Sequence, residues 1–212
     1  MRRSLLLVAV LGCANAGGNT ANPAGDSQQV LTQPEVSLEC RPQPGSQAVP
    51  ERTSPFDSAR VMVGGQAAEV CYGRPSVRGR VIFGPDGGEP APLVPYGKLW
   101  RTGANEPTII HLPFSATIAG LAVSPGSYSI YTIPGADTWT VIVNRSVTQW
   151  GHESRYTPEV QAQEVGRAPV RSERLDQQVE MFTIRSEPTS SGADLILEWE
   201  RTRVRIPIVA TS

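Results

Sequence analysis

The sequence predicts an all-β protein, an antiparallel β-sandwich or jelly-roll-like fold of about nine or ten short strands. From residue 59 onward, apolar and polar residues alternate, which is the period of a strand with one buried face. Twenty glycines and 19 prolines in 212 residues favour turns between short strands over long helices. A content of 39% hydrophobic and 18% charged side chains suits one globular domain and excludes a disordered or a polytopic membrane protein.

The alternation locates the strands within residues 59–210, the predicted β domain. The first strand ends at Val63, and Gly64-Gly65 then predicts a hairpin turn, because glycine accepts positive φ at both positions. Pro207 cannot donate a ladder hydrogen bond, so the last strand is expected at a sheet edge or with the missing donor pointing outward. The other strands are predicted at residues 67–73, 80–83, 108–114, 127–133, 139–143, 162–170, 180–186, 195–200 and 204–208.

A single helix start interrupts the strands. Thr157 is a capping residue, and Pro158 follows it at the first helical position, where the missing N–H of proline has no consequence. We expect a short helix there.

Residues 1–12 have the features of a signal peptide of the lipoprotein type. A pair of arginines precedes a short apolar stretch at residues 5–11 (LLLVAVL), below the about 20 apolar residues that a membrane span needs. The sequence VLGC, ending at Cys13, resembles a bacterial lipobox, in which cleavage precedes a lipidated cysteine. Residues 14–16 (ANA) offer an ordinary cleavage site and a secreted soluble protein as the alternative. We expect a cell-envelope protein that an N-terminal acyl anchor holds to the membrane, facing the periplasm or the cell exterior.

Residues 13–58 are rich in Gly, Asn, Pro, Ser and Gln and are predicted to form a tether. If Cys13 is lipidated, Cys40 and Cys71 remain, and an even number of cysteines outside the cytoplasm favours a disulfide. The alternation around Cys71 places it on the less buried face of its strand, where the tether can reach it. The sequence predicts a Cys40–Cys71 disulfide, with two unrelated thiols as the alternative.

Charge and motifs narrow the function classes. Nineteen basic and 20 acidic residues give a net charge of −1, so no nucleic-acid partner is predicted. The chain has no nucleophile elbow, zinc-protease helix, paired CxxC, phosphate-binding loop or dinucleotide-binding motif. The spacing of His111 and His152 gives no support to a metal site, and we predict neither a metal nor a cofactor.

The loops within residues 72–106 are the candidate binding region. Arginines there are suited to bidentate bonds with carboxylate or phosphate, and the aromatic rings are suited to stacking, so we expect a small polar ligand, a glycan or an acidic metabolite. One alternative is a structural or assembly lipoprotein whose arginines fasten loops and whose surface contacts another envelope protein. The other is a hydrolase in which Glu106 acts as general acid or base beside Arg101. The predicted ligand-binding residues are Arg74, Arg78, Arg80, Tyr96, Trp100, Arg101, Asn105 and Glu106.

The same loops resemble a known bacterial family. YGRPSVRGR at residues 72–80 and LVPYGKLWRTGANE at residues 93–106 are similar to hallmark blocks of the domain of unknown function 2911, and QWG at residues 149–151 agrees. The resemblance covers residues 54–209 and implies an exported, β-rich protein without an assigned activity. Phe56 departs from the pattern because the family commonly has arginine at that position.

Overall fold

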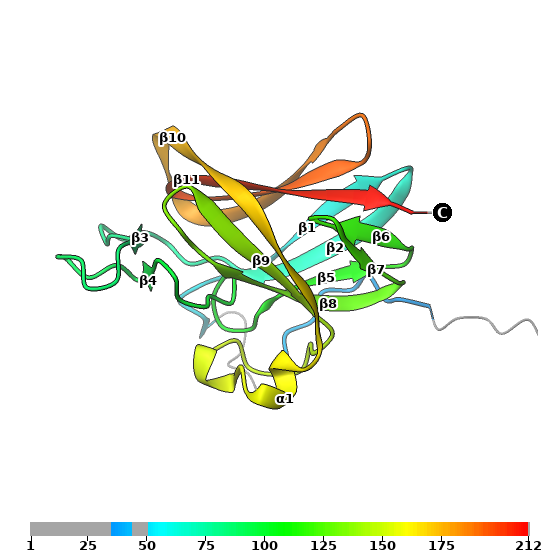
Figure 1. Ribbon diagram of the computed structural model, residues 1–212, viewed down its shortest axis with the longest axis horizontal. Helices are drawn as coiled ribbons and strands as arrows, with labels where there is room; N and C mark the ends of the chain where they lie inside the picture. The colour runs from blue at the N-terminus through cyan, green and yellow to red at the C-terminus, as the bar shows by residue number, and fades with distance from the viewer. Residues whose placement is uncertain (1–34, 44–50, 212) are drawn as a thin grey trace, which may run out of the picture. The chain divides into compact units, whose positions relative to one another are not determined.

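The structure is a computed structural model that describes residues 35–43 and 51–211. The signal peptide and Cys13 therefore lie outside the described residues. The all-β prediction is confirmed (Figure 1). Within the described ranges, no helix is long and apolar enough to cross a membrane. The elements are β1 (Phe56–Val63), β2 (Gln66–Gly73), β3 (Phe83–Gly84), β4 (Val94–Pro95), β5 (Thr108–Leu112), β6 (Ala116–Ile118), β7 (Leu121–Val123), β8 (Gly126–Ile133), β9 (Thr138–Asn144), the 3-10 helix η2 (Glu153–Arg155), α1 (Pro158–Gln161), β10 (Glu164–Pro188) and β11 (Ala193–Ala210).

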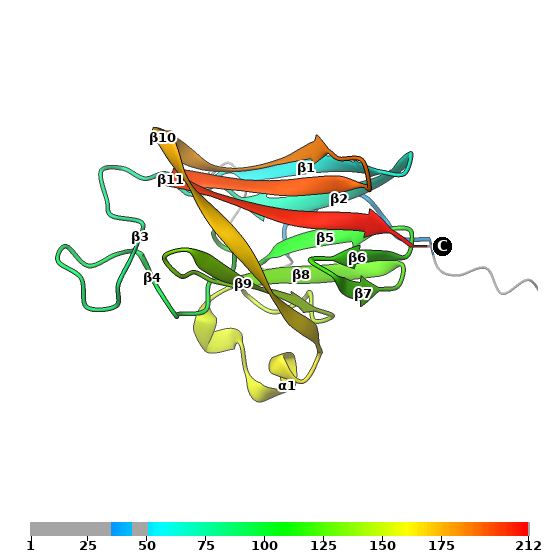
Figure 2. The same ribbon diagram turned by 45° about the horizontal axis from the view of Figure 1, so that its top comes forward.

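Nine strands form one antiparallel sheet in the order β1-β2-β5-β8-β9-β10-β11-β6-β7. Strand β10 belongs to both layers of this folded sheet, because its residues 164–171 pair with β9 and its residues 172–188 pair with β11. The gold-to-orange ribbon of β10 makes this crossing visible (Figure 2). The apolar faces of the two layers meet inside and form the core of the predicted β-sandwich. Strands β3 and β4 form a separate parallel pair.

The C-terminal strands are longer than the sequence predicts. The expected strand 162–170 coincides with β10 from Glu164 onward, 180–186 is a part of β10, and 195–200 and 204–208 are parts of β11. The charged stretch between the two halves of β10 resembles a loop in sequence, yet it stays extended. Residues 172–174 pair with β11, and pairing resumes at Val179 and again at Thr183 after a register shift before each of them. Ladder hydrogen bonds do not depend on side-chain polarity, so the polar stretch continues the strand.

Three local turn and helix features agree with their sequence signals. Gly64 and Gly65 form the β1–β2 hairpin with φ of 58° and 81°. Helix α1 begins with Pro158 after the N-cap residue Thr157. Pro207 lies beyond the last β10–β11 pair at Val204, where no β10 partner is lost, and its carbonyl accepts a hydrogen bond from Ala119 at 2.8 Å. Strand β11 lies between β10 and β6, so the edge position expected for it is wrong, and the alternative holds that no β10 ladder bond needs the N–H that Pro207 lacks.

The core contains an aromatic cluster in which Trp100 and Trp199 stack at 5.7 Å between ring centroids with an interplanar angle of 17°. Phe83 packs edge-on against both rings and against Trp139, and Phe182 closes the group. Trp100 is only 4% exposed, although the sequence suggested a ring available for a ligand. Aromatic side chains bury about 150–250 Å² each, so this cluster is a large part of the core.

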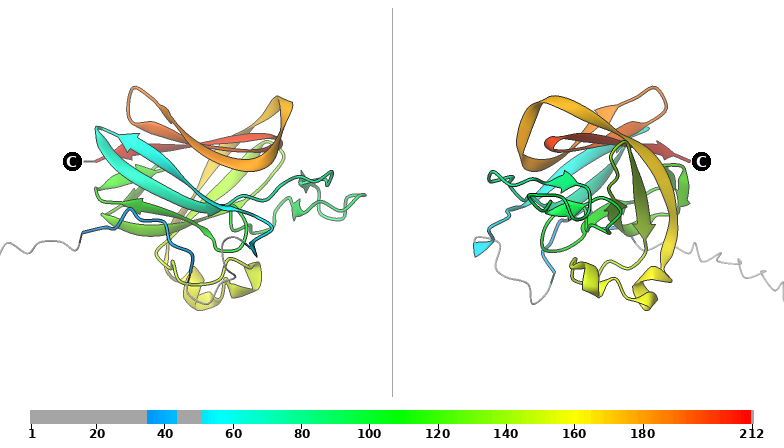
Figure 3. Two further views of the ribbon diagram at one scale, coloured as in Figure 1. Left: turned by 180° about the vertical axis from the view of Figure 1, so that it is seen from behind. Right: turned by 60° about the vertical axis from the view of Figure 1, so that its left-hand side comes forward.

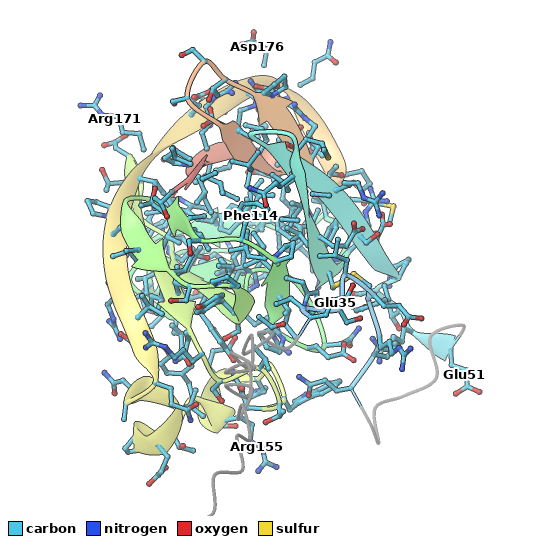
Figure 4. The ribbon with its side chains drawn as sticks, turned by 90° about the vertical axis from the view of Figure 1, so that its right-hand side faces the viewer. Glu35, Glu51, Phe114, Arg155, Arg171 and Asp176 are labelled. Carbon is cyan, nitrogen blue, oxygen red and sulfur yellow. A yellow bond between two sulfur atoms is a disulfide. The ribbon has the colours of Figure 1, made fainter. Side chains whose placement is uncertain are left out.

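Residues 35–43 are fastened to the body by the Cys40–Cys71 disulfide, whose Cα atoms are 5.4 Å apart (Figure 4, where Glu35 marks the beginning of this segment). The predicted disulfide is confirmed. The alternation had placed Cys71 on the less buried face of its strand, but Cys71 is only 4% exposed. Strand β1 begins at Phe56, inside the range assigned to the tether.

Candidate functional site

A pocket of about 500 Å³ lies where the predicted loops meet residues 53–54 and the turn that follows Gly151. The loop that carries β3 and β4 projects from the body beside it (Figure 3). Cationic side chains outnumber acidic ones in the lining, with Glu153 the acidic member among the described residues. The lining residues are Thr53, Ser54, Pro75, Ser76, Arg78, Arg80, Leu93, Val94, Pro95, Lys98, Leu99, Trp100, Arg101, Gly103, Ala104, Asn105, Glu153 and Trp199.

The pocket brings together part of the predicted ligand-binding set. Arg78, Arg80, Trp100, Arg101 and Asn105 line it. The remaining predicted residues, which are absent from this lining, are Arg74, Tyr96 and Glu106. Sequence reasoning missed the hydroxyl side chains of residues 53–54, which were assigned to the tether, and the acidic residue that follows the QWG block.

Arg101 is a largely buried cation with few partners. Its side chain is 20% exposed, and its Nη2 lies 3.8 Å from the nearest Glu153 oxygen, a loose ion pair. Nη1 donates to the carbonyl oxygen of Asn105 at 3.2 Å. Nε is buried and has no hydrogen-bond partner among the described residues. A buried N–H without a partner costs about 1–3 kcal/mol, so this guanidinium has unused hydrogen-bond donors at Nε and Nη2.

Arg78 and Arg80 are exposed, and their guanidinium groups donate to backbone carbonyls, while the backbone N–H of Arg78 donates to Glu180 Oε1 at 2.9 Å. Arg78 Nη2 reaches Thr53 at 3.3 Å, and Arg80 reaches Val77 through Nε at 3.0 Å and Ser76 through Nη2 at 2.5 Å. Neither forms an ion pair with a carboxylate in the described ranges, so their charges at the pocket are uncompensated by direct contact.

The backbone of the lining loops has an unusual concentration of positive φ. Arg78 (φ 50°), Thr102 (56°) and Asn105 (68°) are non-glycine residues in this left-handed region. Such conformations cost about 1–3 kcal/mol each and persist where the surrounding contacts hold them in place.

Gly151 explains why the QWG block packs on these loops. A Cβ atom at Gly151 would lie 2.5 Å from the carbonyl oxygen of Asn105 and 2.8 Å from Cδ of Arg101. The Gly151 N–H donates to that same carbonyl at 3.2 Å. Only glycine allows this approach, which brings Glu153 to the pocket.

Arg74 holds the two layers together instead of lining the pocket. Its guanidinium donates to the carbonyl of Phe182 at 3.1 Å, to Asp57 at 2.9 Å and to Thr183 Oγ1 at 3.0 Å. These partners come from β10 and β1, while Arg74 follows β2. Its position matches the fastening role that the sequence offered as an alternative.

Glu106 forms a buried ion pair with Arg52. Both guanidinium Nη atoms donate to its two oxygens, at 2.7 and 2.8 Å, and the side chains are 1% and 4% exposed. The backbone N–H of Gln43 donates to the same carboxylate at 3.1 Å. Burial alone would raise the pKa of the Glu106 carboxyl, but the hydrogen bonds from Arg52 and Gln43 outweigh it and the pKa lies below its ordinary value. Glu106 is thus an ionised, occupied acceptor near neutral pH.

A second cavity, of about 370 Å³, lies between residues 39–43 and the faces of β2, β5 and β8, and most of its surface is apolar. His111 lines it and shares a 2.7 Å hydrogen bond with Ser127. Burial lowers the pKa of His111, and the charge of Glu69 offsets this in part. Within the described ranges, no group of three or more His, Cys, Asp or Glu side chains is placed to hold a metal ion.

The fold and the pocket define a disulfide-containing antiparallel β-sandwich with a cation-rich cleft at one end of its strands. Residues 54–208 match the family described as "Protein of unknown function (DUF2911)", and the chain belongs to this family. No curated protein and no solved structure gives a significant match.

Proposed function

We propose that the protein binds a small acidic ligand in the 500 Å³ pocket. A carboxylate or phosphate of the ligand lies against Arg101 and Arg78, and the remainder lies along the polar and apolar wall. An acidic metabolite and the acidic sugar of a glycan share this chemistry.

The observation that carries the proposal is the under-used guanidinium of Arg101, whose buried Nε has no partner in the described part of the chain. Nη2 has only the loose contact with Glu153 at 3.8 Å, so a ligand carboxylate in the pocket gains a charge-assisted hydrogen bond there, and a turn of the side chain brings the parallel N–H groups of Nε and Nη2 to the same carboxylate. The nearby charges of Arg78 and Arg80 add attraction, because no direct carboxylate contact neutralises them among the described residues.

Isothermal titration calorimetry with glucuronate, citrate and inorganic phosphate tests the proposal, with glucose as the neutral comparison. We expect at least one anion to bind, and Arg101→Gln to weaken that binding about 10- to 100-fold, the range for a charge-assisted hydrogen bond. Arg60→Ala is the matched control, because Arg60 is 65% exposed, pairs with Glu69 and lies outside the pocket lining. Equal affinities for wild type and Arg101→Gln contradict the proposal.

We further propose that the protein acts in the cell envelope as a lipoprotein anchored through Cys13, facing the periplasm or the cell exterior. The Cys40–Cys71 disulfide supports an oxidising compartment. Palmitate labelling of wild type and Cys13→Ala distinguishes the anchor from the secreted alternative. Labelling that is unchanged in the variant excludes lipidation at Cys13.

A structural or assembly role is the second candidate, and the position of Arg74 across the two layers favours it. Pull-down of the full chain from detergent-solubilised membranes tests it. An envelope protein that Arg101→Gln still captures, together with no anion binding by wild type, supports assembly over ligand binding.

A further inference from the structure

Residues 35–43 and 51–55, which we name the strap, are fastened to the β-sandwich by covalent and ionic contacts. Cys40 is joined to Cys71 of β2. Three residues further along, the backbone N–H of Gln43 donates to Glu106, and Gln43 Nε2 donates to the carbonyls of Val147 and Gln149, each at 3.0 Å. The first described part of the strap is therefore held near its C-terminal end, by the disulfide at Cys40 and by the hydrogen bonds of Gln43.

The second part of the strap is held by the same carboxylate. Arg52 binds Glu106 through both Nη atoms, and its guanidinium carbon lies 5.8 Å above the ring centre of Phe56. Glu106 thus joins two segments that come from either side of residues 44–50. A single buried anion fixes both, so loss of its charge affects both.

The strap also forms a wall of the pocket, through Thr53 and Ser54. Its carbonyl oxygens accept hydrogen bonds from the predicted binding loops: Thr53 from Arg78 Nη2 at 3.3 Å and Ser54 from Asn105 Nδ2 at 3.4 Å. The next carbonyl in the chain, of Pro55, accepts from the Arg74 N–H at 2.8 Å. These hydrogen bonds therefore hold the Thr53–Ser54 wall and the Arg78 and Asn105 side chains in place together.

We infer that the strap is a latch for the acidic-ligand pocket: the Thr53–Ser54 wall is in place when Cys40 and Cys71 are oxidised and Glu106 is paired with Arg52, and binding weakens when either fastening is broken. This inference rests on the proposed function of the pocket. Glu106 is then a positioning residue, and not a ligand-binding or acid–base residue. The disulfide couples binding to the redox state of the compartment.

The redox step needs only a thiol reductant. A dithiol transfers two electrons and two protons to the disulfide, the Cys40–Cys71 bond breaks to give two thiols, and the dithiol closes to its own cyclic disulfide. Reduction frees Cys40 from β2. The strap is then held by hydrogen bonds alone, those at Glu106 together with those of the Gln43 side chain and of the carbonyls of residues 53–55.

The first test measures glucuronate affinity by calorimetry. We expect about tenfold weaker binding after reduction with dithiothreitol and in Cys40→Ser/Cys71→Ser, and a similar loss in Glu106→Gln, because the pocket is complete in only a fraction of the molecules. Glu198→Gln is the matched control: Glu198 is 9% exposed and pairs with Arg185 and Arg203, and it does not line the pocket. A structural role alone weakens binding equally in both glutamine variants.

Arg52→Lys serves if Glu106→Gln fails to fold, because it keeps the charge and loses the bidentate geometry. Unchanged glucuronate affinity in the reduced protein and in Arg52→Lys overturns the latch.

The second test does not depend on a ligand. Hydrogen exchange followed by mass spectrometry measures the opening of residues 51–57 and 101–106 in oxidised and reduced protein. We expect exchange in both segments to accelerate about tenfold on reduction, with no change in β9. Unchanged exchange overturns the latch even if oxidised protein binds glucuronate. If none of glucuronate, citrate and phosphate binds but exchange still accelerates on reduction, the proposed function of the pocket is rejected, while the loosening of the strap on reduction is supported.

Discussion

The Arg52–Glu106 pair gives the sharpest stability prediction. The two side chains are 1% and 4% exposed, and two charge-assisted hydrogen bonds of 2.7 and 2.8 Å join them. Glu106→Gln removes the charge but leaves the guanidinium buried, and breaking a buried pair in this way costs about 3–5 kcal/mol. A domain of this size loses roughly 2–4 °C of melting temperature per kcal/mol, so we expect Tm to fall by about 6–20 °C.

Urea unfolding measured by tryptophan fluorescence gives the free energy directly, and a double-mutant cycle isolates the pair. Arg52→Met leaves an unpaired carboxylate, which is also costly, whereas Arg52→Met/Glu106→Gln leaves neither charge. We expect the double variant to be more stable than the sum of the single losses by about 1–3 kcal/mol. Single losses below about 1 kcal/mol, or additive losses, refute a coupled buried pair.

Three further predictions use other contacts. The difference in unfolding free energy between wild type and Glu106→Gln should narrow as pH falls below roughly 4.3, the pKa of Glu in the unfolded chain. The pKa of the folded Glu106 carboxyl is lowered, so its ionised form stabilises the fold above that pH, and this stabilisation is lost when the folded carboxyl is protonated. Urea unfolding at several pH values between about 3 and 7 checks this, and a constant difference contradicts it. Arg74→Ala should lower the unfolding free energy by about 1.5–3 kcal/mol, since it unlinks Phe182, Asp57 and Thr183, whereas Arg60→Ala should change it by under about 1 kcal/mol. Gly151→Ala should destabilise by about 1–3 kcal/mol, because its Cβ meets backbone atoms of the 105–106 loop, and a neutral result in thermal unfolding means that this turn is loosely packed.

Local sequence patterns predicted the features that depend on neighbours in the chain. Alternation located most strands, and two consecutive glycines fixed the β1–β2 turn. The disulfide followed from the even number of cysteines that remain if Cys13 is lipidated, because parity does not require knowledge of the fold. The strand expected at residues 80–83 was wrong, because β3 contains only Phe83 of this range.

Features that depend on distant contacts were not predictable in this way. Glu106 and Arg52 are 54 residues apart, and Arg52 lies in a segment whose composition is that of a tether. In the sequence, Glu106 is an acidic residue among arginines. That pattern fits a ligand-binding role, a catalytic role and a buried ion pair equally well. Trp100 is a similar case, since stacking on Trp199 from β11 buries a ring that appears available in its loop.

Different arginines of this region have different roles: some fasten loops to the sandwich, and others are free to bind a ligand. A guanidinium carries several N–H donors in one plane, so the number already used decides what it can still do. Arg74 directs Nε and both Nη atoms to protein acceptors and is a fastener. Arg101 has a single hydrogen bond, through Nη1, and a buried Nε without a partner in the described ranges. Arg78 is intermediate, because one Nη holds the strap at Thr53 while the rest of the group faces the pocket. Ligand binding therefore depends most on Arg101, and strap and ligand meet at Arg78.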